Sequence, residues 1–266
     1  MLIHSFWNNS KSNLVLAIDN HAPTSLEVHG DGSPFLKKIK NLTYHTTTAT
    51  GIQLRGDVYE CNQVSFGNVA FNKVVVFDMP YRHDQKGGMT VNGVFGDNLM
   101  AKGIWKIDFI QHLITLTSSI DSMEKTSDMV KIPCRFEDNM IILDVVYPGQ
   151  IYARGSIDLG YSGMVIMPDS LFRALNTAST QLRNTQSTRK SPKEGILKSD
   201  RSALGTVSLG EVHTKTVFVT DPAIRETLFG LAFFSRFKFI ILDYIHQVVY
   251  LSRSTINPSY RSEDHY

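Results

Sequence analysis

The sequence of 266 residues predicts a mainly β fold made of two related β-rich lobes with pseudo-twofold symmetry. Short apolar runs alternate with Gly, Asn and Pro along the chain, which is typical of strands joined by turns. Few segments have the period of an amphipathic helix. Several blocks of residues also recur in the same order in the two halves, and such self-similarity indicates a duplicated unit.

The recurring blocks have nearly constant offsets along the chain. Val64–Val69 is echoed by Val207–Val212, and Val94–Gly96 is echoed by Leu228–Gly230. Two further pairs, which share one identical offset, are Ile107–Phe109 with Leu242–Tyr244 and Leu113–Leu116 with Val248–Leu251. Small insertions between the blocks account for the differences. This shared order favours duplication over an unrelated β protein whose strands merely look alike.

An Asp follows an apolar strand at matching places of the two halves. Leu14–Ile18 leads into Asp19, and Ser156–Ile157 leads into Asp158, at an offset close to that of the other blocks. We expect a strand, a tight turn and a strand in each half, with the carboxylate at the turn. Most such Asp residues only bond the backbone of their own turn. The repeat, rather than either Asp alone, therefore indicates a shared role.

Duplication also predicts how the two carboxylates act. We expect Asp19 and Asp158 to face each other at the floor of a cleft between the lobes, within a few ångström or bridged by one water. Two carboxylates about 3 Å apart cannot both ionise, so they share a proton. The ionised group would polarise a water, and the protonated group would donate to a substrate carbonyl. This arrangement suits amide hydrolysis without a covalent intermediate.

The repeat predicts where the lobes begin and end. We expect an N-terminal lobe over residues 1–116, a polar linker over residues 117–129 and a C-terminal lobe over residues 130–266. In the second lobe, residues 176–194 are almost wholly polar and predict an inserted surface loop.

A Thr-rich stretch in the first lobe predicts a β-hairpin. It spans residues 46–55, and its tip at Thr50 and Gly51 could overhang a cleft as a flap. An ordinary exposed hairpin explains the same pattern equally well.

The composition and the first residues indicate which kinds of partner and which cellular compartment to expect. A net charge of +2 without a basic cluster argues against a nucleic-acid partner. No apolar run has the length needed to span a bilayer. The first residues lack a basic start followed by an apolar segment. We expect a cytoplasmic monomer, or a protein of the cell envelope or a secreted one if a leader is missing from this sequence.

Neither cysteine nor histidine spacing indicates a metal site. Cys61 and Cys134 form no metal-binding pattern, and their spacing leaves open whether they pair or stay free. Four histidines are conceivable ligands, but no ligand spacing supports them: His21, His29, His45 and His83. We therefore expect no metal and no other cofactor.

The recurring blocks resemble the aspartic peptidases of the retropepsin and pepsin group, and most closely the two-lobed aspartyl protease family proteins of bacteria. Members carry Asp-Thr/Ser-Gly after an apolar strand in each lobe. An apolar pair with Gly, a short helix and a hairpin containing Asp-Tyr or Asp-Phe follow. Here the later block is Gly93–Met100 in the first lobe and Leu228–Phe234 in the second. The resemblance spans residues 4–252 and implies acid protease architecture, with Asp19 and Asp158 as the catalytic pair.

Both Asp turns depart from the family pattern. Asn20 and His21 follow the first Asp, and Leu159 and Gly160 follow the second. In the family, the Thr or Ser hydroxyl reaches across to the other lobe and locks the two turns together. Asn20 offers a polar substitute, whereas Leu159 does not. His21 adds a Cβ and an imidazole where the family has Gly, and the imidazole would alter the proton balance of the pair.

The sequence therefore supports two functions. The retained Asp pair favours an aspartic-type endopeptidase that acts on a peptide or protein substrate. The changes at Asn20, His21 and Leu159 favour a catalytically impaired relative that binds a peptide or another ligand in the inter-lobe cleft.

Overall fold

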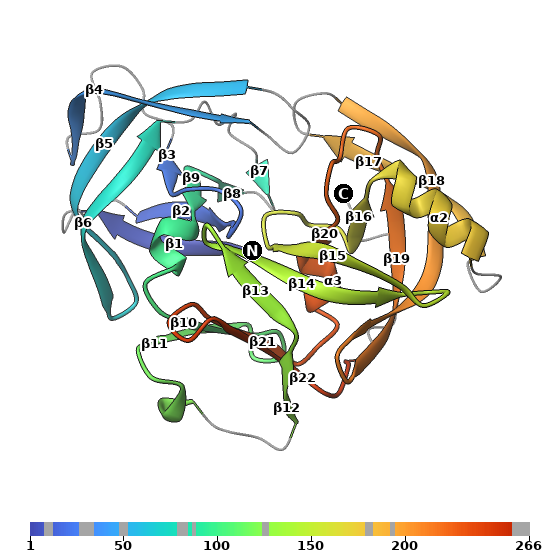
Figure 1. Cartoon of the computed structure of the whole chain (residues 1–266). Helices are drawn as coiled ribbons and strands as arrows, with labels where there is room; N and C mark the ends of the chain where they lie inside the picture. Colours follow the sequence, from blue (N-terminus) through green and yellow to red (C-terminus); the bar gives the residue numbers. More distant parts are fainter. Residues whose placement is uncertain are drawn as a thin grey trace. The chain divides into compact units, whose positions relative to one another are not determined.

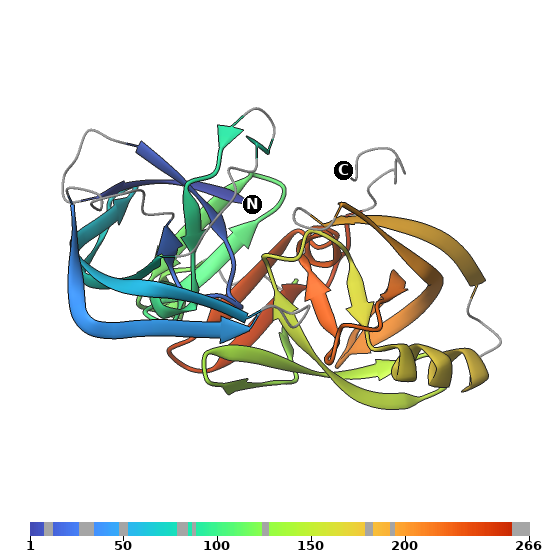
Figure 2. The ribbon, with the colours of Figure 1, turned by 90° about the horizontal axis from the view of Figure 1, so that it is seen from above.

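The computed structural model describes residues 1–7, 13–26, 35–47, 53–78, 85–86, 89–123, 128–178, 183–191 and 195–256. The chain forms two compact units, Met1–Lys102 and Gly103–Tyr266 (Figure 1, Figure 2). Strands dominate both units, as the sequence predicts, and the helices of the described residues are short: α1 (Asp97–Met100), η1 (Ile120–Ser122), α2 (Asp169–Ala178) and α3 (Leu231–Phe234). Among these helices, none has the length and apolar character needed to cross a membrane.

The first unit is a closed sheet around an apolar core. Its strand order is β1-β2-β9-β3-β6-β5-β4, and β1 also pairs with β5, which closes six strands into a barrel. Trp7, Leu16, Val64 and Phe95 are almost completely buried. The bounds are β1 (Leu2–Trp7), β2 (Asn13–Ile18), β3 (Ser25–Leu26), β4 (Leu36–Thr47), β5 (Gln53–Phe66), β6 (Val69–Asp78) and β9 (Gly93–Phe95), with a separate short pair β7 (Gln85–Lys86) and β8 (Met89–Thr90).

The second unit contains an equivalent barrel. Its strand order is β13-β14-β15-β20-β16-β19-β18-β17, and β14 also pairs with β18, which again closes six strands. Leu143, Ile157, Phe218 and Phe229 are almost completely buried. The bounds are β13 (Cys134–Glu137), β14 (Met140–Tyr147), β15 (Ile151–Asp158), β16 (Val165–Met167), β17 (Arg183–Ser191), β18 (Gly195–Leu209), β19 (Val212–Thr220) and β20 (Leu228–Gly230).

The two barrels share strand order and register. In the second barrel, β14, β15, β20, β16, β19, β18 and β17 take the places of β1, β2, β9, β3, β6, β5 and β4. The β5–β6 and β18–β19 hairpins turn at the counterparts Gly67 and Gly210, and their strands pair in the same register. Both glycines have a left-handed backbone, with φ of 54° and 59°. The predicted two related lobes are therefore confirmed at the level of strand topology.

A five-stranded sheet in the second unit contains a local twofold axis. Its order is β11-β10-β21-β22-β12, with bounds β10 (Ile104–Asp108), β11 (Leu113–Thr117), β12 (Met129–Ile132), β21 (Phe239–Asp243) and β22 (Val248–Ser252). Antiparallel pairing of β10 with β21 places Lys106 opposite Ile241, its own counterpart in the repeat. A twofold rotation through this pair therefore relates the β10–β11 hairpin to the β21–β22 hairpin. His112 and Gln247, also counterparts, have positive φ in the two hairpin turns.

The compact units divide the chain before the β10–β11 hairpin, whereas the predicted lobe boundary lies after it, at residues 117–129. The reason is the twofold pairing. Along five residue pairs, β10 bonds to β21, so the hairpin packs with the second unit although it belongs to the first copy of the repeat. The copies of the repeat and the compact units therefore end at different residues.

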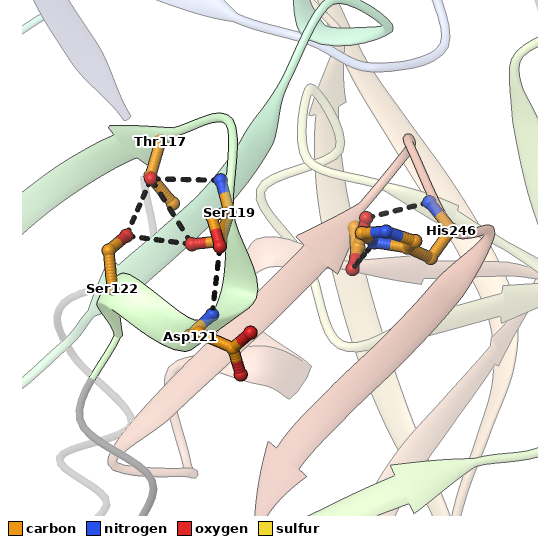
Figure 3. A network of polar contacts seen from close by, with 6 residues as sticks. Thr117, Ser119, Asp121, Ser122 and His246 are labelled. Carbon is orange, nitrogen blue, oxygen red and sulfur yellow. Dashed lines mark hydrogen bonds and ion pairs between the residues drawn. The ribbon is translucent and has the colours of Figure 1, made fainter.

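Part of the predicted linker is ordered by local contacts. Thr117 Oγ1 accepts the N–H of Ser119, and Ser119 Oγ accepts the N–H of Asp121, which caps η1 (Figure 3). Met123 then joins an apolar cluster with Ile104 of β10. The polar composition of this segment thus reflects capping and turn formation rather than a free connection.

The loop predicted over residues 176–194 is partly wrong. The helix α2 continues to Ala178, and β17 pairs with β18 from Arg183 to Ser191. Polar composition concealed this strand, because an edge strand pairs through backbone groups and natural edges are often polar or charged.

Asp128 connects the start of β12 to the segment after β22. Its Oδ1 accepts hydrogen bonds from the backbone N–H and the hydroxyl of Ser254, at 3.0 and 2.8 Å, and its Oδ2 lies 3.1 Å from Lys238 Nζ. Burial alone would raise the pKa of Asp128. The bonds from Ser254 and Lys238 outweigh burial and hold the pKa below its ordinary value. The folded state therefore favours the ionised carboxylate.

Replacing Asp128 with Asn should lower the free energy of unfolding by about 1–2 kcal/mol at neutral pH, because the negative charge that strengthens the bonds from Ser254 and pairs with Lys238 is removed. Since the folded-state pKa lies below the unfolded one, this stabilisation is present above the unfolded pKa and disappears as pH falls through the folded pKa. Urea denaturation should show the difference between the two proteins shrinking below about pH 4. The exposed Asp144→Asn serves as control. An equal loss in that control, or a difference that does not change with pH, would contradict this role.

Candidate active site

The Asp19 turn follows β2 and is held by backbone groups of the first unit. The strand β2 pairs in parallel with β9, and the Asp19 N–H donates to the Phe95 carbonyl at 3.1 Å. The His21 N–H donates to Asp19 Oδ1 at 2.9 Å. Asp19 is half-buried. A backbone donor two residues along the chain therefore fixes a carboxylate that solvent still reaches.

The Asp158 turn has the same place in the second unit. The strand β15 ends at Asp158 and pairs in parallel with β20, with Asp158 opposite Gly230. The Tyr161 N–H donates to Asp158 Oδ1 at 2.9 Å and lies 3.3 Å from the Asp158 carbonyl oxygen. Asp158 is 9% exposed. The two carboxylates are thus held alike, with the backbone donor one residue further along in the second turn.

A glycine at the start of each short helix lets that helix pack against the Asp turn. Gly96 precedes α1 and Gly230 precedes α3, at matching places of the repeat. A Cβ at Gly96 would overlap the backbone of Ala22, and a Cβ at Gly230 would overlap the carbonyls of Gly163 and Tyr161. Glycine is required at both positions by this close approach.

Backbone N–H groups at the start of the short helices hold the two turns in the same way. The Asp97 N–H donates to the Ala22 carbonyl at 2.8 Å, and the Leu231 N–H donates to the Tyr161 carbonyl at 2.7 Å. Each donor follows its helix glycine by one residue, and each acceptor follows its Asp by three. The second half therefore repeats the support of the turn as well as the Asp.

Two polar side chains that the repeat pattern did not indicate brace the Asp19 turn. Thr24 is buried, and its Oγ1 accepts the Gly96 N–H at 3.0 Å. The Thr24 N–H donates to Asn98 Oδ1 at 2.9 Å. In the sequence, these residues could have been recognised only by their positions: Thr24 is five residues after Asp19, and Asn98 is two residues after Gly96.

The residues that depart from the family pattern occupy buried positions beside the Asp residues. Asn20 is 0% exposed and Leu159 is 1% exposed. The apolar Leu159 leaves no hydroxyl at this place of the second turn. The His21 N–H donates to Asp19 Oδ1, so the departure at this position lies in the side chain. Gly160 is exposed.

Another Asp pair of the repeat has a structural role. Asp108 and Asp243 are counterparts in the β10–β11 and β21–β22 hairpins. Asp108 Oδ1 accepts the Gln111 N–H at 2.9 Å, and Asp243 Oδ1 accepts the His246 N–H at 2.9 Å. Asp243 Oδ2 also lies 2.8 Å from His246 Nδ1 (Figure 3). These carboxylates cap hairpin turns.

The predicted flap is a hairpin whose tip lies outside the described residues. The strands β4 and β5 pair up to Thr47 opposite Gln53, so the hairpin itself is confirmed. Thr50 and Gly51 fall between the described ranges. Their position over a cleft stays a prediction.

No cluster suited to a metal ion occurs in the part of the chain that the structure describes, in the sense of three or more His, Cys, Asp or Glu residues together. His29 and His83 lie outside that part. Neither Cys61 nor Cys134 is part of a disulfide, and burial raises the pKa of the Cys134 thiol.

Comparison with known proteins identifies the fold. No family model and no curated protein matches the sequence. The crystal structure of basic 7S globulin from soybean matches with a TM-score of 0.58 and 11% identity, over 96% of this chain and 90% of that one. The chain has a pepsin/retropepsin-like fold. A retropepsin-like aspartic protease from Rickettsia conorii is also similar, with a TM-score of 0.35 and 18% identity, over 48% of this chain and 96% of that one.

Replacing Gly230 with Ala should lower the free energy of unfolding by about 3 kcal/mol, because the new Cβ overlaps backbone that cannot rotate away. The expected loss follows from the close packing of α3 on the Asp158 turn. Chemical denaturation measures it. Gly67→Asn is a matched control, since nothing lies within 4 Å of its Cβ position and Asn tolerates a φ of 54°. Equal stability of the Gly230 variant and the control would show that this contact is not tight.

Proposed function

We propose that the protein is an aspartic-type endopeptidase in which Asp19 and Asp158 form one active site between the two lobes. The observation that carries this proposal is the equivalence of the two Asp turns. Each follows a barrel strand paired in parallel with the strand before a short helix, and in each a backbone N–H fixes one carboxylate oxygen. The fold supports the proposal, because it is the fold of aspartic proteases.

In the proposed reaction the two carboxylates share one proton. The ionised carboxylate polarises a water, which attacks the carbonyl carbon of the scissile peptide bond. The protonated carboxylate donates a hydrogen bond to the carbonyl oxygen as negative charge develops there. The ionised carboxylate takes a proton from this water during the attack. When the tetrahedral intermediate collapses, the same carboxyl group donates that proton to the leaving nitrogen and the C–N bond breaks. Backbone hydrogen bonds that hold each carboxylate reduce the reorganisation needed during these steps.

A binding protein without peptidase activity is the second candidate. Leu159 carries no hydroxyl with which to join the two turns, and His21 places an imidazole two residues after Asp19 in the sequence. The missing hydroxyl would loosen the catalytic pair, and the imidazole would alter its charge. The backbone hydrogen bonds of each turn would stay intact. In that case the same cleft would hold a peptide or another ligand without cleaving it.

Replacing either Asp19 or Asp158 with Asn should reduce cleavage of a broad peptide pool by about 100-fold or more. Each substitution removes one carboxylate of the acid–base pair. The assay should run from acid to neutral pH, with mass spectrometry of the products. Asp138→Asn, at an exposed turn position of the second unit, controls for the loss of a surface carboxylate. If both variants still cleave peptides, Asp19 and Asp158 are not the catalytic residues.

Restoring the family pattern should raise any weak activity. The triple variant Asn20→Thr, His21→Gly, Leu159→Thr returns the hydroxyls and the small residue to the two turns. A buried hydrogen bond regained there contributes about 1 kcal/mol, and a misplacement of about 1 Å in the catalytic groups costs on the order of 100-fold in rate. We expect the rate of the variant to rise and to disappear again when Asp158→Asn is added.

Three outcomes of this assay separate the two functions. Weak cleavage that rises in the triple variant supports a degraded peptidase. Strong cleavage by the unmodified protein shows that the departures at Asn20, His21 and Leu159 do not impair it. If neither the unmodified protein nor the folded variant cuts any peptide, the cleft is a binding site.

A further inference from the structure

The five-stranded sheet of the second unit has an edge that its own local symmetry leaves unfilled. The twofold rotation through the β10–β21 pair relates β11 to β22, and β10–β11 has the same register as β21–β22. On its outer side β22 pairs with β12. Among the described residues, no strand pairs with the outer side of β11 (Figure 1). The sheet therefore has five strands where the symmetry has places for six.

The side chains of β11 are more exposed than their counterparts in β22. Val249 and Leu251 are completely buried, at 0% exposure. Their counterparts Ile114 and Leu116 are only half-buried, and Leu113 is 53% exposed. The difference matches the cover that β12 gives to β22 and that β11 lacks.

The strand β11 also lacks the charge found in the other edge strands. Charged residues at a sheet edge discourage pairing with another chain. In the three larger sheets, each of the other strands that pair on one side only contains a charged residue: Lys37 in β4, Lys131 in β12, Arg135 in β13 and Arg183 in β17. By contrast, β11 consists of Leu, Ile and Thr alone. Since Ile and Thr favour strands, β11 is suited to pair with a further strand.

The strand β12 shows what the unfilled place requires. It pairs antiparallel with β22, and Val130 lies opposite Leu251. Two residues later, Ile132 lies opposite Val249. Val130 and Ile132 are buried, and Lys131 between them is exposed. A strand in this place therefore needs apolar residues at two alternate positions and tolerates a polar residue between them.

A second copy of β11 meets this requirement in the same register. When two β11 strands pair antiparallel about Thr115, Ile114 of each copy lies opposite Leu116 of the other. The local twofold axis carries the register of β12 on β22 over to this same pairing. The residues agree position by position, since Met129–Ile132 and Leu113–Leu116 both have the order apolar, apolar, polar, apolar. A register that is symmetric about one residue is also what a twofold dimer requires.

We propose that the protein forms a twofold homodimer in which two β11 strands pair antiparallel and join the two five-stranded sheets into one. Ile114 and Leu116 of the two copies then cover each other as cross-strand neighbours. Two short strands bury less surface than a standard interface, so the dimer dissociates on dilution. The inference does not depend on the proposed active site, and it replaces the monomer expected from the sequence.

Sedimentation equilibrium of the full chain over a concentration series tests the dimer. The mass should rise from the monomer value of 29.9 kDa to twice that value by about 0.1 mM. Thr115→Lys should raise the dissociation constant at least about tenfold, because two like charges then lie directly opposite each other. The matched control is Thr47→Lys, at an exposed threonine of the edge strand β4, and it should leave the dissociation constant unchanged.

Opposite charges at the same residue test the register. Thr115→Glu alone should also weaken the dimer, whereas a mixture of the Thr115→Lys and Thr115→Glu proteins should form a heterodimer, because unlike charges then meet across the axis. Urea denaturation checks that both variants remain folded.

Three results overturn the inference. The first is a chain that stays monomeric up to about 0.1 mM, and the second is a dimer that Thr115→Lys and Thr47→Lys affect equally. The third is a mixture of the two Thr115 variants that gives no heterodimer. A monomeric chain that binds a labelled peptide of the β12 sequence would assign the edge to a strand of another protein in place of a second copy.

Discussion

The close packing of a short helix against each Asp turn is the constraint on which the proposed site depends. Gly96 and Gly230 allow this packing, because any side chain there would overlap the backbone of the turn. This packing brings the N–H groups at the start of each helix to the carbonyls of the turn. The resulting hydrogen bonds fix the backbone of the turn just after the Asp. The register of the parallel pairs β2–β9 and β15–β20 then fixes the position of each Asp along its barrel.

The repeat made most of this arrangement predictable. Nearly constant offsets between the recurring blocks indicated two related lobes and matched Asp19 with Asp158, and the strand orders of the two barrels agree. The sequence did not reveal that β10 would pair with its own counterpart β21, because two strands of similar composition have many possible partners. It also concealed β17, whose residues are polar and whose pairing uses backbone groups. Thr24 and Asn98 were missed because their role appears only when distant segments meet.

The departures in the two turns affect different parts of the proposed site. His21 preserves the backbone donor to Asp19, so the change from Gly leaves the support of that carboxylate in place. Leu159 is buried and apolar, so the second turn has no polar side chain at this position, while its backbone hydrogen bonds remain. Glycine packing and hydrogen bonds hold each turn, so the support of the turns is separable from the side chains at Asn20 and Leu159, which bear on the proposed catalysis.

The central claim is that Asp19 and Asp158 belong to one site, and oxidation of the double variant Asp19→Cys, Asp158→Cys tests it most directly. A disulfide requires Cα atoms about 4.4–6.8 Å apart, which lies within the range open to Asp residues whose carboxylates share a proton. Peptide mapping after mild oxidation should find the two introduced thiols joined, while Cys61 and Cys134 remain reduced as in the unmodified protein. If the introduced thiols stay unjoined in a folded protein even when a short thiol-reactive cross-linker is added, or pair only with the native cysteines, the two Asp residues do not form one site.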